Sequence, residues 1–305
     1  MCLIGLAADL PGPWLLVVAA NRDEFHDRHT APAAYWGSTP NGLLAGRDLQ
    51  GGGTWLGMRR VPDGGSIRIA ALTNLRPGLM PAPPVDLPGQ PAVPPSRGQL
   101  VANFLRTSAE PEVFLRDLDP PAAAYAGFNL LALRLATVQA GGTAAATGNA
   151  SGNASHAARN AADAVPGLDA WYLNNLPGAP ARRLGTGVHL VSNATLDVAW
   201  PKTTLLHGAL TEALSGMHDS AQLCARLFDA LADRSLAVDA ELPQTGLDHA
   251  RERMLSAPFI VDDHYGTRCS TVIIVSRTGD VLFSERSFGP AGQPLGRFTE
   301  RFSLV

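Results

Sequence analysis

Cys2 is the residue of this sequence that is best placed for nucleophilic chemistry. Two apolar runs, residues 2–8 and 14–20, are separated by a stretch with proline and glycine, and this pattern predicts a β-hairpin. In such a hairpin Cys2 lies opposite about residue 20, beside the cluster Asn21-Arg22-Asp23-Glu24. Pairing within the hairpin therefore gathers a thiol, an arginine and two carboxylates at one end of a sheet.

The chemistry that this cluster predicts is acyl transfer by Cys2 after removal of Met1. The small second side chain favours that removal, which leaves Cys2 with a free α-amine of pKa about 8, suited to a general base at neutral pH. Arg22 would lower the thiol pKa, and Asp23 would accept hydrogen bonds from the α-amine and fix its orientation. One residue would then carry both the nucleophile and its base.

An acyl-transfer site also needs hydrogen-bond donors for the oxyanion that develops. Asn74 and Asn193 each end a strand-like run, and Arg268 directly precedes the run that begins at Cys269. We expect either asparagine amide to bind the oxyanion. Arg268 is expected to hold the charged cluster in register or to meet a substrate carboxylate.

Simpler interpretations of these residues remain open. A cysteine in a strand is usually a small buried apolar residue, a charged run at a hairpin end is usually solvated, and strand-end asparagines often serve in turns. His26 and His29 have no further ligand spacing beside them, so neither a metal nor a cofactor is predicted. Gly51-Gly52-Gly53 lacks the pattern of a phosphate-binding loop and is predicted to be a flexible turn.

The elements that would position these residues come in blocks. Further strands are predicted at 54–58, 67–73, 128–135, 188–192, 270–276, 281–287 and 297–302, the last three as a meander. Helical periodicity predicts helices at 97–107, 111–118, 200–215 and 220–231. Strand blocks that alternate with helix blocks favour an α+β layered sandwich over βαβ repeats.

Length favours one domain over residues 1–305. Within it, segment 76–96 with its eight prolines and segment 141–163, rich in small polar residues, are predicted to be loop insertions. Of 24 basic residues only Lys202 is a lysine, so cationic chemistry rests almost entirely on arginine.

Charge and hydropathy exclude several partner classes. A net charge of −3 gives no sign of nucleic acid or of an acidic membrane surface as a partner. No apolar run near the start approaches the roughly 20 residues that span a bilayer, so no integral membrane segment is predicted. Three cysteines without paired spacing predict a reducing compartment, the cytoplasm.

Several short motifs, taken in order, resemble the NRDE family, which is also called the transport and Golgi organisation family. They cover nearly the whole chain: Met1-Cys2-Leu3-Ile4, Ala20-Asn21-Arg22-Asp23-Glu24-Phe25, Gly51-Gly52-Gly53-Thr54-Trp55-Leu56-Gly57, Ala71-Leu72-Thr73-Asn74, Gly127-Phe128-Asn129-Leu130, Leu190-Val191-Ser192-Asn193, Trp200-Pro201-Lys202, Tyr265-Gly266-Thr267-Arg268 and Glu285-Arg286-Ser287. The two loop insertions depart from the pattern and leave the motifs intact.

That family is similar in fold and site layout to the N-terminal nucleophile hydrolases of the choloylglycine hydrolase and penicillin V acylase group. The resemblance implies a four-layer αββα sandwich with antiparallel sheets and a cysteine nucleophile that cleaves a linear amide or related acyl bond. By order and context, the catalytic roles fall on Cys2, Arg22, Asp23, Asn74, Asn193 and Arg268.

The resemblance also implies a second class of function. Eukaryotic members of the family are linked to secretory organisation, haem trafficking and lipid metabolism. A non-catalytic carrier would use the same pocket for haem or an acyl-lipid ligand, with Arg22 and Arg268 meeting propionate or phosphate groups. In a third interpretation, a structural or interaction protein, the motif only supports the hairpin.

Overall fold

The computed structural model describes residues 2–37, 42–61, 65–80, 94–139 and 164–304. The predicted insertion at 141–163 lies outside these residues, and of the insertion at 76–96 only the two ends are described. Among the described residues, no helix combines the length and the apolar character that crossing a bilayer requires.

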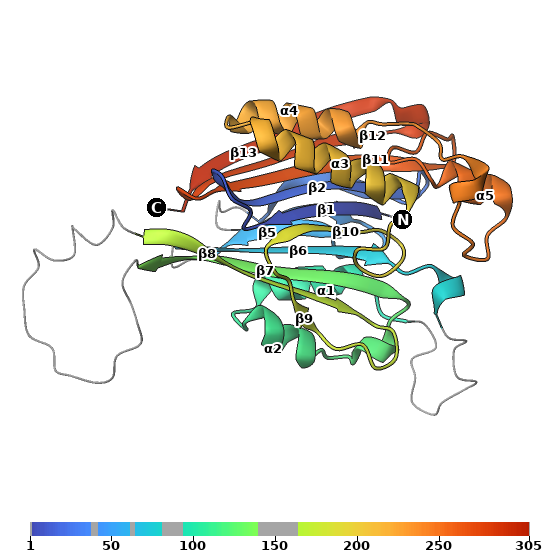
Figure 1. Cartoon of the computed structure of the whole chain (residues 1–305). Coiled ribbons are helices and arrows are strands. Elements are labelled where there is room, and N and C mark those ends of the chain that lie inside the picture. Colours follow the sequence, from blue (N-terminus) through green and yellow to red (C-terminus); the bar gives the residue numbers. More distant parts are fainter. Residues whose placement is uncertain (1, 38–41, 62–64, 81–93, 140–163, 305) are drawn as a thin grey trace, which may run out of the picture.

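Two antiparallel sheets form the middle of the molecule (Figure 1). The first sheet has the order β10-β1-β2-β11-β12-β13, from β1 Cys2–Ala8, β2 Trp14–Phe25, β10 Gly187–Val191, β11 Tyr265–Ser276, β12 Asp280–Phe288 and β13 Pro294–Ser303. The second sheet runs in sequence order, from β3 Thr30–Trp36, β4 Leu43–Asp48, β5 Leu56–Arg60, β6 Ser66–Asn74, β7 Phe128–Gln139, β8 Ala164–Asn174 and β9 Arg182–Arg183.

Helices cover the outer face of each sheet. The second sheet carries α1 Gly98–Arg106 and α2 Pro111–Arg116, and the first carries α3 Pro201–Gly216 and α4 Ser220–Leu231. A fifth helix, α5 His249–Met254, precedes β11, and short 3-10 turns lie at Pro77–Leu79, Ala122–Ala124, Asp239–Glu241 and Pro290–Gly292. The layers are therefore helix, sheet, sheet and helix, which confirms the predicted α+β sandwich with antiparallel sheets.

β2 shows why the sequence produces this layering. Successive side chains of a strand point to opposite faces, and β2 is apolar at nearly every position from Trp14 to Ala20. Leu16 and Val18 pack into the core between the sheets, while Val17 and Ala19 pack under α3 and α4. A strand buried on both faces needs a cover on both faces, and the second sheet and the helices provide it.

The turn at Gly51-Gly52-Gly53 is held by a close approach of two backbones. Thr54 N donates a hydrogen bond of 3.1 Å to the carbonyl oxygen of Gly98, the first residue of α1. A Cβ built on Gly53 would lie 2.2 Å from the carbonyl carbon of Gly98. The predicted turn is therefore present, and Gly53 lets it dock against α1.

Gly53→Ala should lower the free energy of unfolding by about 1–3 kcal/mol, because the obstructing atoms belong to backbone and cannot rotate away. Gly185→Ala is a matched control, since a Cβ there meets nothing within 4 Å. Urea denaturation of both variants measures the difference. Equal stability of the two variants would contradict the close contact.

Candidate active site

A cavity of about 780 Å³ opens between the two sheets at the end where β1 begins. Five of the six predicted site residues line it, and the sixth does not. The lining residues among them are Cys2, Arg22, Asp23, Asn74 and Arg268. Hairpin pairing therefore brings Cys2 and the charged cluster to one cavity, as the sequence predicted.

Cys2, Arg22 and Cys269 form a row across three strands. Arg22 of β2 pairs with Cys2 on one side and with Cys269 of β11 on the other. Paired residues point to the same face, so the two thiols flank the guanidinium on the side that faces the second sheet. The sequence placed Cys2 opposite about residue 20. The observed partner, Arg22, lies two residues further along because the last pair of the ladder is Ala8 with Leu16, which centres the turn on residue 12 and not on residue 11.

The charged cluster is not a solvated hairpin end. Asn21, Arg22 and Asp23 are 0%, 8% and 1% exposed, because β2 continues to Phe25 between two neighbouring strands. Arg22 forms an ion pair of 3.6 Å with Glu24. This observation removes the simplest alternative interpretation of the run.

Burial sets the ionisation of both thiols in the row. Burial raises the pKa of the Cys2 thiol, while the Arg22 charge acts in the opposite direction. Burial and the nearby Glu285 carboxylate raise the pKa of Cys269 well above its usual value. Glu285 itself accepts hydrogen bonds from Ala33 N at 2.7 Å and from the Thr271 hydroxyl at 3.1 Å. The raised pKa favours the neutral thiol of Cys2, so an attack by Cys2 needs a base that takes its proton.

Iodoacetamide should alkylate Cys2 slowly at pH 7, with a rate that still rises above pH 9, the ordinary pKa of a cysteine thiol. The reason is that only the thiolate reacts, and a raised pKa moves its formation to higher pH. Arg22→Gln should slow the reaction further at each pH, because it removes a cation that favours the thiolate. Peptide mass spectrometry from pH 6 to 10 gives both profiles, and a plateau below pH 8.5 would refute the raised pKa.

The side chain of Asp23 points to the other face of β2 from Arg22, toward the helices, and Asp23 reaches the cavity at the end of the sheet where β1 begins. The Thr267 hydroxyl donates to Asp23 Oδ1 at 2.8 Å, and the Tyr265 hydroxyl donates to the Asp23 carbonyl oxygen at 3.1 Å. Burial raises the pKa of Asp23, and the charge of Lys202 is the strongest opposing influence. Asp23 is thus fixed one residue beyond Arg22, the pairing partner of Cys2, at the end of the sheet where β1 begins.

The two predicted oxyanion residues lie together but differ in what their amides do. Asn193 is fully buried, and its Nδ2 donates to the carbonyl oxygen of Asn74 at 2.9 Å. Asn193 is absent from the cavity lining, whereas Asn74 contributes to it, and the Asn74 amide makes no hydrogen bond within the described residues. Asn74 is therefore free to donate to a ligand, and Asn193 holds its backbone in place.

A chain of hydrogen bonds links the two sheets beside this point. The Ser192 hydroxyl donates to the carbonyl oxygen of Cys2 at 2.8 Å, and the Thr73 hydroxyl donates to the Ser192 carbonyl oxygen. Asn129 Nδ2 donates to Thr73 Oγ1 at 2.9 Å, and the Tyr172 hydroxyl donates to Asn129 Oδ1 at 2.6 Å. These hydrogen bonds fix the position of Cys2 relative to Thr73 of β6 and Asn129 of β7.

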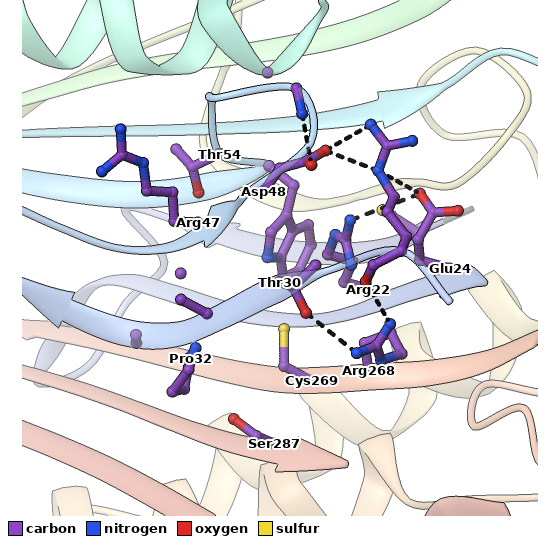
Figure 2. Close-up of a pocket in the computed structure, with 18 of the residues that line it drawn as sticks. Arg22, Glu24, Thr30, Pro32, Arg47, Asp48, Thr54, Arg268, Cys269 and Ser287 are labelled. Carbon is purple, nitrogen blue, oxygen red and sulfur yellow. Dashed lines mark hydrogen bonds and ion pairs between the residues drawn. The ribbon is translucent and has the colours of Figure 1, made fainter. Parts of the chain in front are cut away.

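Arg268 positions the segment that follows β2. Its Nη1 donates to the carbonyl oxygens of Phe25 at 2.8 Å and Arg28 at 3.1 Å. Its Nη2 donates to Thr30 Oγ1 at 3.2 Å (Figure 2). Arg268 therefore holds the segment directly after the charged cluster, which is close to its predicted role of holding that cluster in register. A substrate carboxylate would have to compete with them.

Two cations near Cys2 were not singled out as site residues from the sequence. Arg97 lines the cavity at the start of α1, and within the described residues its only hydrogen bond goes to the carbonyl oxygen of Gly127 at 2.9 Å. It has no ion-pair partner there. Lys202 lies behind Asp23 and is 1% exposed. Arg97 carries no sequence signal beyond a basic residue before a helix, whereas Lys202 belongs to the Trp200-Pro201-Lys202 motif.

The sequence is similar to a known family over most of its length. The family model described as Transport and Golgi organisation 2 matches residues 1–290. Transport and Golgi organization protein 2 homologs of Bos taurus and Homo sapiens are 31% and 30% identical to this chain, over 94% of the chain and 93% of each relative. Transport and Golgi organization protein 2 of Drosophila melanogaster is 31% identical over 44% of the chain and 46% of its own length. The family match spans most of the elements that surround the cavity.

Proposed function

Because this chain belongs to the Transport and Golgi organisation 2 family, we propose that it is a cysteine N-terminal-nucleophile hydrolase acting on a linear amide or a related acyl bond. The observation that carries the proposal is the placement of Cys2. It begins a strand inside a sheet, pairs with Arg22, and shares a cavity with Asn74, whose amide makes no hydrogen bond among the described residues.

The reaction would proceed in two steps, acylation of Cys2 and hydrolysis of the resulting thioester. Once Met1 is removed, the α-amine of Cys2 takes the thiol proton as Sγ attacks the acyl carbon, and Asn74 donates to the oxyanion. Collapse of this intermediate breaks the acyl bond, and the α-ammonium gives its proton to the leaving amine or alcohol. Water, deprotonated by the same α-amine, then hydrolyses the thioester and releases the carboxylic acid and the free thiol.

The raised thiol pKa supports this order of events. A neutral thiol cannot act alone at pH 7, so the mechanism needs a base within reach, and the α-amine has an ordinary pKa of about 8. Asp23 would accept a hydrogen bond from that amine and favour its protonated form after attack. Arg22 would stabilise the thiolate character that develops on Sγ.

The cavity wall suits a substrate with an acyl chain. Phe288, Leu295 and Phe298 of the β12–β13 region line it, and together with Trp55 they provide apolar surface near the row of thiols. Arg97 adds a cation without a carboxylate partner among the described residues. We further propose that the reaction takes place in the reducing cytoplasm, because a thiol nucleophile must stay reduced.

A second function is favoured by one observation. Burial raises the pKa of the Cys2 thiol, and a binding pocket without chemistry would show the same direction. In that case the protein binds haem or an acyl-lipid ligand in the same cavity, and Arg22 or Arg97 meets its propionate or phosphate. A carrier of this kind would bind its ligand equally well after Cys2→Ala.

The deciding experiment is the intact mass of the untagged protein before and after exposure to 4-nitrophenyl acetate at pH 7.5. Loss of the Met1 mass followed by a single acetyl adduct on Cys2 is the expected result. Cys2→Ala is the control and should gain no adduct. Retention of Met1, or an unreactive Cys2 in folded protein, would overturn the hydrolase and favour the carrier.

A further inference from the structure

Lys202 is buried at a position where a charged side chain lowers the stability of the fold. It is the only lysine of the chain, its side chain is 1% exposed, and its Nζ has no hydrogen-bond partner among the described residues. It also occupies the first turn of α3, and a helix N-terminus disfavours positive charge. Lysine is almost never fully buried without a partner, so some other group must compensate this charge.

The fold places Lys202 and Asp23 on the same side of the first sheet. α3 packs against β1 and β10, and Asp23 points from β2 toward the helix layer. The charged and titratable groups that face Lys202 are Asp23 of β2, Cys2 of β1, Arg76 after β6 and Glu252 of α5. Arg76 and Glu252 are engaged in an ion pair with each other. Asp23 is the carboxylate whose charge most strongly favours the charged form of Lys202.

The ionisation of the two groups is consistent with this pairing. Burial lowers the pKa of Lys202 to about 8, and Asp23 is the main influence that opposes the fall. Burial raises the pKa of Asp23, and Lys202 is the main influence that opposes that rise. Each group thus favours the charged form of the other within a buried layer.

We propose that Lys202 is a positioning residue of the Cys2 site, whose buried charge keeps Asp23 ionised so that Asp23 can hold the α-amine of Cys2. This inference rests on the proposed function. Lys202 touches no substrate, since it is absent from the cavity lining. It acts through Asp23 from the opposite face of the sheet.

A further consequence concerns the base itself. An isolated carboxylate beside the α-amine would raise the pKa of that amine and leave it protonated, and so inactive as a base, at neutral pH. A second cation nearby opposes this effect. Removing Lys202 therefore raises the pKa of both Asp23 and the α-amine, and both changes move the onset of activity to higher pH.

The test compares Lys202→Met, which removes the charge at similar volume, with Lys202→Arg, which keeps it. Carboxyl ¹³C NMR follows the titration of Asp23, with its signal identified by its loss in Asp23→Asn. The midpoint should rise by about 1–3 pH units in Lys202→Met and return toward the wild-type value in Lys202→Arg. The acidic limb of Cys2 acylation by 4-nitrophenyl acetate should move in the same direction.

Arg68→Met is the matched control, because Arg68 is also a buried cation at 2% exposed, but its Nε donates to the carbonyl oxygen of Phe104 on the outer side of the second sheet. It should lower the melting temperature and leave both profiles unchanged. Lys202→Met should also melt lower than the wild type, because it leaves the buried carboxylate of Asp23 without its balancing charge. The two profiles, and not the melting temperature, therefore distinguish Lys202→Met from Arg68→Met.

An unmoved Asp23 midpoint in folded Lys202→Met overturns the inference. So does a moved midpoint with an unmoved acylation profile, because Lys202 would then not serve Cys2. If wild-type Cys2 is never acylated, the proposed function fails, and the NMR midpoint still decides whether Lys202 controls Asp23.

Discussion

Cys2→Ala should reduce hydrolysis of an acyl substrate at least about 10⁴-fold, to the rate of the uncatalysed reaction plus whatever the bound oxyanion donors supply. The reason is that the substitution removes both the nucleophilic sulfur and the covalent intermediate, whereas the α-amine and the Asn74 amide stay in place. Steady-state kinetics on the substrate that acylates the wild type most rapidly would measure this effect. Circular dichroism would confirm that the variant is folded.

Cys224→Ala is the control for loss of a thiol. Cys224 is buried in the helix layer among the side chains of α3 and α4, away from the cavity lining. This variant should keep wild-type activity. A Cys2→Ala protein that still turns over substrate would eliminate the nucleophile assignment and leave the binding function as the stronger candidate.

Glu252→Ala should lower the free energy of unfolding by about 3–5 kcal/mol, the usual effect of leaving one partner of a buried ion pair alone. Arg76 and Glu252 are 3% and 4% exposed and form a direct ion pair. Thr245 completes the pair, since its N donates to Glu252 Oε1 at 3.0 Å and its hydroxyl accepts from Arg76 Nη1 at 2.6 Å. Chemical denaturation at pH 7 would measure the loss.

A double-variant cycle and the pH dependence distinguish this pair from ordinary packing. Arg76→Met combined with Glu252→Met should recover much of the lost stability, because no unpaired charge remains. Burial alone would raise the pKa of Glu252, but hydrogen bonds from Thr245 and Arg76 outweigh it and lower the pKa. The contribution of the pair is therefore present above pH 4.5, the ordinary value, and is lost as pH falls through the lowered pKa. Additive single effects would refute the coupling.

The same pair ties the chemistry to the fold. Arg76 N donates to the carbonyl oxygen of Asn193 at 2.9 Å, and Asn193 in turn holds Asn74. A loss of the ion pair should therefore displace Asn74 before the sheets separate. Activity lost at a denaturant concentration that leaves the circular dichroism unchanged would be the sign of this displacement.

The sequence predicted the layering well where its patterns were long. The apolar run of β2 and the helical periodicity of α3 and α4 each correspond to an element within a few residues of the predicted bounds. Strands β3, β4, β8 and β9 were not predicted. β3 contains Pro32 and several alanines, which weaken a strand pattern, and it forms because an edge strand tolerates a proline.

Pairing within the first hairpin predicted which residues lie near Cys2. It did not predict which of the site residues are already held by hydrogen bonds to other parts of the protein. The contact between Cys2 and Arg22 depends on one hairpin and could be found from spacing. The different tasks of Asn74 and Asn193 depend on contacts between two sheets, and no local pattern contains that information. Lys202 was not predicted as a site residue because a lysine is expected at the surface, and only the packing of α3 against β1 and β10 places it inside.

The position of β1 between β2 and β10 has a consequence for biosynthesis. β1 can gain its second neighbour only after residues up to Val191 have left the ribosome, which takes roughly 10 to 40 s at 5–20 residues per second. Until then β1 has only β2 as a possible partner, whereas in the folded protein Cys2 is 7% exposed. Maturation of the proposed nucleophile would then be a cotranslational event, so that slow or overloaded processing in a cell yields chains that fold correctly and remain inactive.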